Sequence, residues 1–254
     1  MIPSEFFRKC GVLLKFILTI LLILSSHICE AKDVVILGTL HDEHRRLPLY
    51  TFDTIKVVLE HIKPDLLLIE EDVETLKKNQ TLADSEYAAI RPIEIRKVIL
   101  PYAKKHKIEV IPTDSRVEYD KKMDSVYAKI DDGNEKIKSV QYAYMALFNE
   151  DYLQRSIYDF HDNFSMSVIE GRTLLMKATP QYSEAFKLEE KRQNTINSNI
   201  LTALKSTKAK KICIVYGLTH TPSIMRAVSN AGYNILPLRR AMEPRIVSNF
   251  SKNR

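Results

Sequence analysis

Tryptophan is absent from this chain of 254 residues, glycine occurs only six times and cysteine only three times. Two cysteines, Cys10 and Cys29, fall within residues 1–31, so a chain without that segment keeps only Cys213. A single cysteine cannot form an intramolecular disulfide, which excludes a disulfide-stapled fold. Cys213 lies in the apolar run KICIVYG, where we expect a small buried side chain rather than a catalytic thiol.

The chain also lacks a basic block. Its net charge is +6, yet residues of both signs are interspersed along it. No cluster of Lys and Arg is interleaved with aromatic residues, which argues against a nucleic-acid partner. With 45% hydrophobic and 28% charged residues, the composition is that of a globular protein, and the length suits one domain, with or without an insertion.

Near the N-terminus lies a short apolar run, FILTILLILSS, at residues 16–26. Basic residues precede it, and the small residues Cys29 and Ala31 follow at positions that signal peptidase prefers. The run is short for a membrane span, which needs about 20 residues. We therefore predict that residues 1–31 are a signal peptide and that the mature chain, 32–254, is exported to the periplasm or the extracellular space. An uncleaved N-terminal membrane anchor is the alternative.

Apolar strands alternate with helices in the first half of the mature chain. The predicted strands are 34–38, 65–70 and 108–114, and the predicted helices are 51–62 and 91–107, the second bent at Pro101. Strands that are apolar along their whole length and alternate with helices indicate a parallel sheet.

The pattern changes between residues 115 and about 210. This segment is rich in Lys, Glu, Gln, Asn, Tyr and Met, with apolar residues at helical spacing, and it predicts a helical insertion. The alternation then resumes with a strand at 211–217, a helix at 221–232 and a strand at 233–238. The sequence thus predicts a single α/β domain over 32–254, with a parallel-dominated sheet and a helical insertion.

Two predicted strands end in the same short motif. VVILGTLH places His41 three residues after Gly38, and CIVYGLTH places His220 three residues after Gly217. Glycine lets the chain turn sharply as it leaves the sheet. Since sites in open parallel sheets form at the carboxyl ends of the strands, the two histidines are expected at one edge.

Acidic residues follow two further strands at the same edge. LLLIEED brings Glu70 and EVIPTD brings Asp114. Imidazole and carboxylate groups together suit Zn, Mn, Co or Fe. A divalent transition metal held by His41, Glu70 and His220 would lower the pKa of a bound water and make it a nucleophile.

Simpler explanations exist for the polar residues nearby. His44 is either a further ligand or a surface residue, and Glu71 and Asp72 suit a solvated turn. Glu94 lies in the first turn of a predicted helix, where the helix dipole alone favours an acid. Arg192 and Asn194, in the sequence EEKRQN, can belong to an exposed helix face.

Taken together, these motifs resemble the TraB/GumN/Tiki superfamily, which is related to the haem-binding ChaN proteins and to erythromycin-esterase-like hydrolases. The resembling segments cover most of the mature chain: GTLH, PDLLLIEED, AKKHKIEVIPTD and KRQNTINSNILTAL…KKICIVYGLTHTPSIMRAVSNAGY. The resemblance implies an α/β sheet built from two related halves around a helical insertion.

The resemblance also implies the site residues. The family's two G-x-x-H motifs match Gly38–His41 and Gly217–His220, its glutamate after the second strand matches Glu70, and its helical arginine matches Arg192. A glutamate usually precedes that arginine, whereas here Lys191 takes its place.

Three functions follow as alternatives. In the first, the chain is a metal-dependent hydrolase of a peptide or small molecule, with His41, Glu70, Arg192 and His220 as catalytic residues and Arg192 steadying oxyanion charge. In the second, it is a haem- or iron-binding envelope protein without turnover, in which His41 or an exposed tyrosine is an axial ligand. In the third, it is a scaffold with a degenerate site. Membrane contact is expected only through the N-terminal segment.

Overall fold

The computed structural model describes residues 32–80, 92–130, 135, 138 and 154–243. The signal peptide predicted at residues 1–31 lies outside these residues, as do residues 139–153 of the predicted helical insertion. Contacts within the chain divide it into two units, Met1–Ala31 and Lys32–Arg254. In the described part of the chain, no helix is both long and apolar enough to span a membrane.

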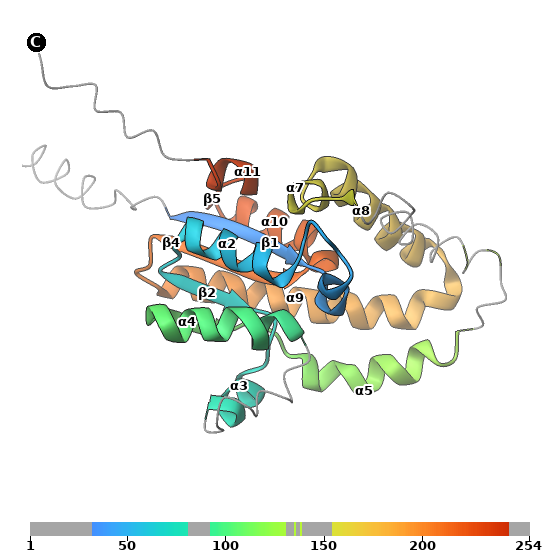
Figure 1. Cartoon of the computed structure of the whole chain (residues 1–254). Helices are drawn as coiled ribbons and strands as arrows, with labels where there is room; N and C mark the ends of the chain where they lie inside the picture. The colour runs from blue at the N-terminus through green and yellow to red at the C-terminus, as the bar shows by residue number, and fades with distance from the viewer. Residues whose placement is uncertain (1–31, 81–91, 131–134, 136–137, 139–153, 244–254) are drawn as a thin grey trace, which may run out of the picture. The chain divides into compact units, whose positions relative to one another are not determined.

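A single five-stranded parallel sheet forms the centre of the second unit (Figure 1). Its strands are β1 (Asp33–Thr39), β2 (Leu66–Ile69), β3 (Glu109–Pro112), β4 (Lys211–Gly217) and β5 (Asn234–Ile235). All pairings are parallel, and the spatial order is β3-β2-β4-β1-β5. The predicted α/β fold with a parallel sheet is confirmed.

Strand β4 lies between β1 and β2, although it comes much later in the sequence. Its register pairs Gly217 with Thr39 on β1 and Val215 with Ile69 on β2. The end of β4 therefore lies between the segment that leads to His41 and the one that leads to Glu70.

Helices make up the connections. They are α2 (Phe52–Ile62), α3 (Val73–Gln80), the π-helix η3 (Ile95–Ile99), α4 (Leu100–His106), α5 (Arg116–Tyr127), α7 (Ile157–Phe160), α8 (Asn163–Ala178), α9 (Ser183–Ser206), α10 (Thr221–Asn230) and α11 (Leu238–Ala241). Short 3₁₀ turns are η1 (His41–Arg45), η6 (Pro180–Tyr182) and η7 (Leu218–His220). The described part of the predicted insertion is helical.

Local sequence signals explain where these helices begin, end and bend. The Thr51 hydroxyl caps α2 by accepting the Thr54 N–H. The helix ends at Ile62 and is followed by Lys63, which is in the left-handed conformation before a proline. At Pro101, where a bend was predicted, the wider π-turn of η3 comes just before the proline. Proline lacks the N–H that a regular α-helix needs, so the preceding turn adjusts.

Both faces of the sheet are buried, as the apolar strands predict. Residues such as Leu37, Leu67 and Val215 pack in one cluster with α2, η3 and α4. Alternate residues such as Ile36 and Ile214 pack in a second cluster with α9 and α10. Cys213 is a fully buried free thiol whose pKa burial raises to about 12, in agreement with the inert role expected for it.

Candidate active site

The predicted residues converge at the carboxyl edge of the sheet. Glu70 and Asp114 follow β2 and β3, while His41 and His220 follow β1 and β4. Glu70 is the centre of the cluster: the His41 Nε2 lies 3.9 Å from its Oε2, and the His220 Nε2 lies 3.7 Å from its Oε1. Both distances are too long for a direct hydrogen bond. The two histidines thus face opposite oxygens of one carboxylate.

Glu94 determines how His41 carries its proton. The His41 Nδ1 lies 2.9 Å from Glu94 Oε1, which also accepts the Thr39 hydroxyl at 2.6 Å. An ionised carboxylate can only accept, so His41 is protonated on Nδ1 and has a lone pair on Nε2. The second Glu94 oxygen is buried without a hydrogen-bond partner among the described residues. A buried carboxylate oxygen without a hydrogen bond lowers the free energy of unfolding. The position of Glu94 is therefore not explained by stability alone.

A chain of amide groups fixes His220 in the same way. Its Nδ1 lies 2.7 Å from Gln193 Oε1, and the Gln193 amide nitrogen donates to Asn197, which in turn donates to Ser223. Because the amide N–H of Gln193 is used elsewhere, its oxygen faces the imidazole and can only accept. His220 therefore also carries its proton on Nδ1. Burial lowers its pKa, which keeps the ring neutral and the Nε2 lone pair available.

Glu70 is held as an anion. Its Oε2 accepts the Gly217 N–H at 2.5 Å, and its Oε1 accepts from Arg192 at 3.3 Å. Burial acts to raise the pKa of Glu70, but His220, His41, Arg192 and the Gly217 N–H together lower it to about 2. At neutral pH the cluster therefore contains a fixed negative charge that faces two imidazole nitrogens.

Arg192 joins Glu70 to Asp114. Its Nε and Nη2 donate to the two oxygens of Asp114 at 3.1 and 2.5 Å, a bidentate pair between α9 and the end of β3. Although burial acts to lower the pKa of the guanidinium, Asp114 and Glu70 raise it further above its usual value. The contacts described for Arg192 go to carboxylates, so its observed part is to orient Glu70. Its predicted role in steadying an oxyanion stays a prediction.

The motif glycines are needed for space rather than for a sharp turn. Gly217 has an ordinary φ of −52°, and Gly38 is not among the residues with positive φ. A Cβ on Gly217 would lie 2.8 Å from His41 Nε2 and 3.1 Å from Glu70 Oε2. The left-handed conformation occurs instead at His41 itself, with φ 52°. The prediction that the glycines serve a sharp turn was therefore wrong, although the motif correctly marked the site.

Two residues near the cluster lie in surroundings other than those predicted for them. His44 is neither a surface residue nor at the cluster: it is buried, its Nε2 accepts the Leu40 N–H, and its Nδ1 donates to the Tyr50 carbonyl. Glu71 does not lie in a solvated turn, since only 2% of it is exposed.

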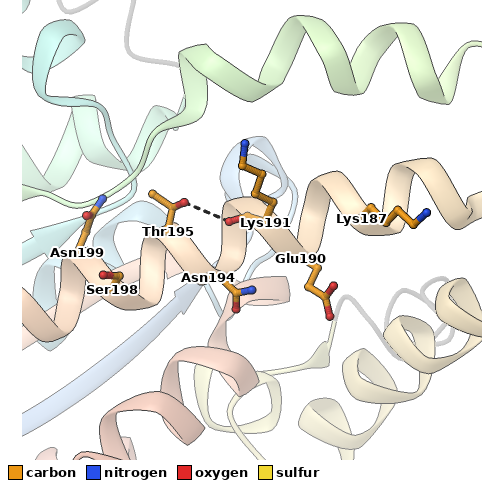
Figure 2. A pocket seen from close by; sticks show the side chains of 7 residues that line it. All are labelled: Lys187, Glu190, Lys191, Asn194, Thr195, Ser198 and Asn199. Atoms are coloured by element: carbon orange, nitrogen blue, oxygen red, sulfur yellow. Dashed lines mark hydrogen bonds between the residues drawn. The ribbon is translucent and has the colours of Figure 1, made fainter.

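Sequence reasoning missed Glu94 and Gln193, the partners of the two histidines, as well as Asn199, which donates to the Thr113 carbonyl. Gln193 and Asn197 lie four residues apart, a helical spacing that could have placed both on one face of α9. Asn194 lies elsewhere, in an open polar cavity of about 450 Å³ on α9 (Figure 2). The cavity is lined by Lys187, Glu190, Lys191, Asn194, Thr195, Ser198 and Asn199, and by neither motif histidine.

The cluster matches the predicted metal site only in part. Two imidazole lone pairs and a carboxylate are donors that a transition metal accepts. Yet among the described residues, no three or more His, Cys, Asp or Glu side chains form a group that could hold a metal ion. Both Glu70 oxygens are already bound, one by Gly217 and one by Arg192. The donor types suit a metal, whereas their arrangement here does not fit one.

Comparison of the chain with family models, with curated proteins and with solved structures gave no match.

Proposed function

We propose that this protein is a hydrolase that activates a water molecule between His41, Glu70 and His220. One observation carries the proposal: two histidines from separate strands, each anchored through Nδ1, present Nε2 to opposite oxygens of one buried carboxylate. Polar groups at these distances can share a water molecule that hydrogen-bonds to both. The resemblance to the TraB/GumN/Tiki superfamily supports the same proposal.

In this mechanism His41 is the general base. Its Nε2 takes a proton from the water, whose oxygen attacks the carbonyl carbon of an ester or amide. Glu94 holds the imidazole by Nδ1 and stabilises the imidazolium that forms, as the carboxylate of a Ser-His-Asp triad does. The imidazolium then returns its proton to the leaving group as the carbon–oxygen or carbon–nitrogen bond breaks. His41 suits this role because 43% of its side chain is exposed and can meet a substrate.

Glu70 and His220 orient the water. Both offer acceptors, so one of them takes the second hydrogen of the water while the first points to His41 Nε2 and an oxygen lone pair faces the substrate. The negative charge of Glu70 also favours protonation of His41 during attack. Arg192 keeps Glu70 in place through its bidentate hold on Asp114.

A metal-dependent form of this hydrolysis is the second candidate, favoured by the two lone pairs that face Glu70. His41, Glu70 and His220 would have to leave the positions described above to hold a divalent transition metal (Mn, Co, Zn or Fe), whose chemistry would be to lower the pKa of water. Anchoring of both Nδ1 atoms is the arrangement that metal-binding histidines show.

Haem binding is less well supported. Axial haem ligands lie beside a broad apolar surface, whereas the described neighbours of His41 are the carboxylates of Glu70 and Glu94. Titration with haem checks this directly, because a Soret band that disappears in His41→Ala would favour haem binding over hydrolysis.

The proposal can be tested with mature protein, p-nitrophenyl acetate and a mixture of fluorogenic peptides. We expect hydrolysis that falls at least a hundredfold in His41→Ala, Glu70→Gln and His220→Ala while the fold is kept. Absence of hydrolysis in the wild type, or equal rates in all proteins, would overturn the proposal. Elemental analysis of these proteins and of Arg192→Lys separates the two forms. A metal retained by the wild type and by Arg192→Lys, but lost from the other three, favours the metal-dependent form.

Export is a separate proposal, which rests on the pattern of residues 1–31. Mass spectrometry of the native protein is expected to find an N-terminus near Lys32. A full-length N-terminus in the membrane fraction would favour the uncleaved anchor instead.

A further inference from the structure

Strand β1 extends beyond β5, so among the described residues no strand pairs with the last part of β1 on that side. β5 pairs only with Asp33 and Val34, and the Val34 carbonyl accepts the Leu236 N–H. Backbone groups of residues two apart point to the same side of a strand, so Gly38 also faces this side. No strand reaches it there among the described residues. The N–H and C=O of Gly38 therefore need other partners.

Two side chains take the place of the missing strand. The His161 Nε2 accepts the Gly38 N–H at 2.7 Å, and the Tyr50 hydroxyl donates to the Gly38 carbonyl at 2.6 Å. The His161 Nδ1 donates to the Ile157 carbonyl at 2.7 Å, so Nε2 keeps its lone pair for Gly38. Burial lowers the pKa of His161 to about 4, which keeps the ring neutral at pH 7.

Further hydrogen bonds fix the backbone between Gly38 and His41. Beyond Gly38, the Leu40 N–H donates to the imidazole of His44, so the residues on both sides of Thr39 are bound by histidines. His41 then adopts φ 52°, a left-handed conformation that is unfavourable for a residue other than glycine. Such a conformation persists only where the neighbouring backbone is fixed.

We propose that His161 is a positioning residue for His41: by accepting the Gly38 N–H, it holds the G-x-x-H segment so that His41 reaches both Glu94 and Glu70. The proposal rests on the proposed function for its effect on turnover, but not for its effect on the structure. His161 comes from the helical segment between β3 and β4. Its hydrogen bond to Gly38 thus adds to those by which Arg192 and Gln193, from the same segment, contact the site.

The test compares His161→Leu with His161→Gln. Glutamine places an oxygen near the position of Nε2 and can accept the Gly38 N–H, whereas leucine cannot. His61→Leu, on the exposed face of α2, is the matched control. Should His161→Leu not fold, His161→Asn replaces it, because asparagine is polar but too short to reach Gly38.

Two NMR measurements detect the effect of the substitution and need no hydrolysis. In His161→Leu, or in its asparagine substitute, hydrogen exchange of the Gly38 amide should speed up at least tenfold. The nitrogen shifts of His41 should change from the Nδ1–H tautomer toward a mixture. His161→Gln and His61→Leu should keep the wild-type pattern. An unchanged His41 tautomer together with an unprotected Gly38 amide would overturn the proposal, as would failure of glutamine to restore the pattern.

Steady-state kinetics provide a second test of the positioning role. His161→Leu should lower kcat by roughly ten- to a hundredfold with little change in KM, because orientation rather than binding is lost. The same change in a His41→Ala background should have no further effect on kcat. Altered NMR spectra without hydrolysis in any protein, the wild type included, would leave the positioning role intact and refute the proposed function.

Discussion

The Nδ1–H of His41 donates to Oε1 of Glu94, 2.9 Å away, although 53 positions separate the two residues in the sequence. Glu94 is nearly inaccessible to solvent, while His41 is half exposed. A buried carboxylate behind an accessible imidazole is the arrangement by which enzymes fix the tautomer of a general base.

Replacing Glu94 with glutamine should therefore stop turnover while leaving the fold intact. The amide can donate to His41 and favour the wrong tautomer, so we expect kcat to fall by about 10²–10⁴-fold. Steady-state kinetics on the ester or peptide identified as a substrate measure the loss. Asp42→Asn, a change at an exposed acid next to His41, is the control and should keep wild-type kcat. Comparable activity in both variants would contradict the role given to Glu94.

Gly217→Ala should separate activity from stability. The added Cβ would lie between His41 Nε2 and Glu70 Oε2, whereas the φ of −52° suits alanine. We expect at least a hundredfold loss of kcat/KM with a smaller change in melting temperature than core substitutions cause. Gly171→Ala is the matched control, since nothing lies within 4 Å of its added Cβ in the middle of α8. It should stabilise the protein by about 0.5–1 kcal/mol and keep full activity.

Removing Arg192 alone should destabilise the fold more than removing Arg192 together with the negative charge of Asp114. In Arg192→Met, the buried carboxylates of Glu70 and Asp114 lose their counter-charge, and we expect a loss of about 3–5 kcal/mol in the free energy of unfolding. Arg192→Met combined with Asp114→Asn should recover part of that loss. Urea unfolding of the three proteins measures it. A double variant less stable than Arg192→Met would show that the pair does not act as a unit.

Acid should destabilise the protein well above pH 4. The folded pKa of His161 is about 4, against 6.5 for an ordinary histidine, so the unfolded chain binds more protons between these values. The free energy of unfolding then falls as the pH drops from about 6.5 to about 4, by up to about 3 kcal/mol from this group. Burial lowers the pKa of His44 and His220 in the same direction. Glu70, with a pKa of about 2, adds a further loss as the pH falls from 4.5 toward 2.

Urea unfolding at pH 7, 5.5 and 4.5 checks the pH dependence. His161→Gln has no titrating group at this position and should show a shallower fall in stability between pH 6.5 and 4. Equal slopes for wild type and variant would mean that His161 is not held neutral in the fold.

Strand ends could be predicted from the sequence because they depend on local patterns. Apolar runs, a glycine and a polar turn are enough to predict that His41, Glu70, Asp114 and His220 share one edge of the sheet. The order of the strands could not be predicted, because nothing local to β4 says that it inserts between β1 and β2. The convergence was therefore expected, but not the central place of Glu70.

The residues that were missed share a different property. Glu94 had a sufficient local explanation as an acid in the first turn of a helix, and that explanation concealed its contact with His41. His161 lies in a segment whose pattern predicted only helices, and its partner is a backbone N–H 123 positions away. Glu71 follows Glu70 in a run of acids, yet it is buried. Partners that come together only through tertiary structure leave no periodic signal in the sequence.

β4 is the fourth strand to be synthesised, and it fills the gap between the first two. Until residues 211–217 have left the ribosome, β1 and β2 have no common neighbour, and each has an unpaired edge. The sheet can close, and His41 and Glu70 can meet His220, only after this later strand has been made. Until then the proposed active site lacks one of its two histidines and the strand that joins its halves.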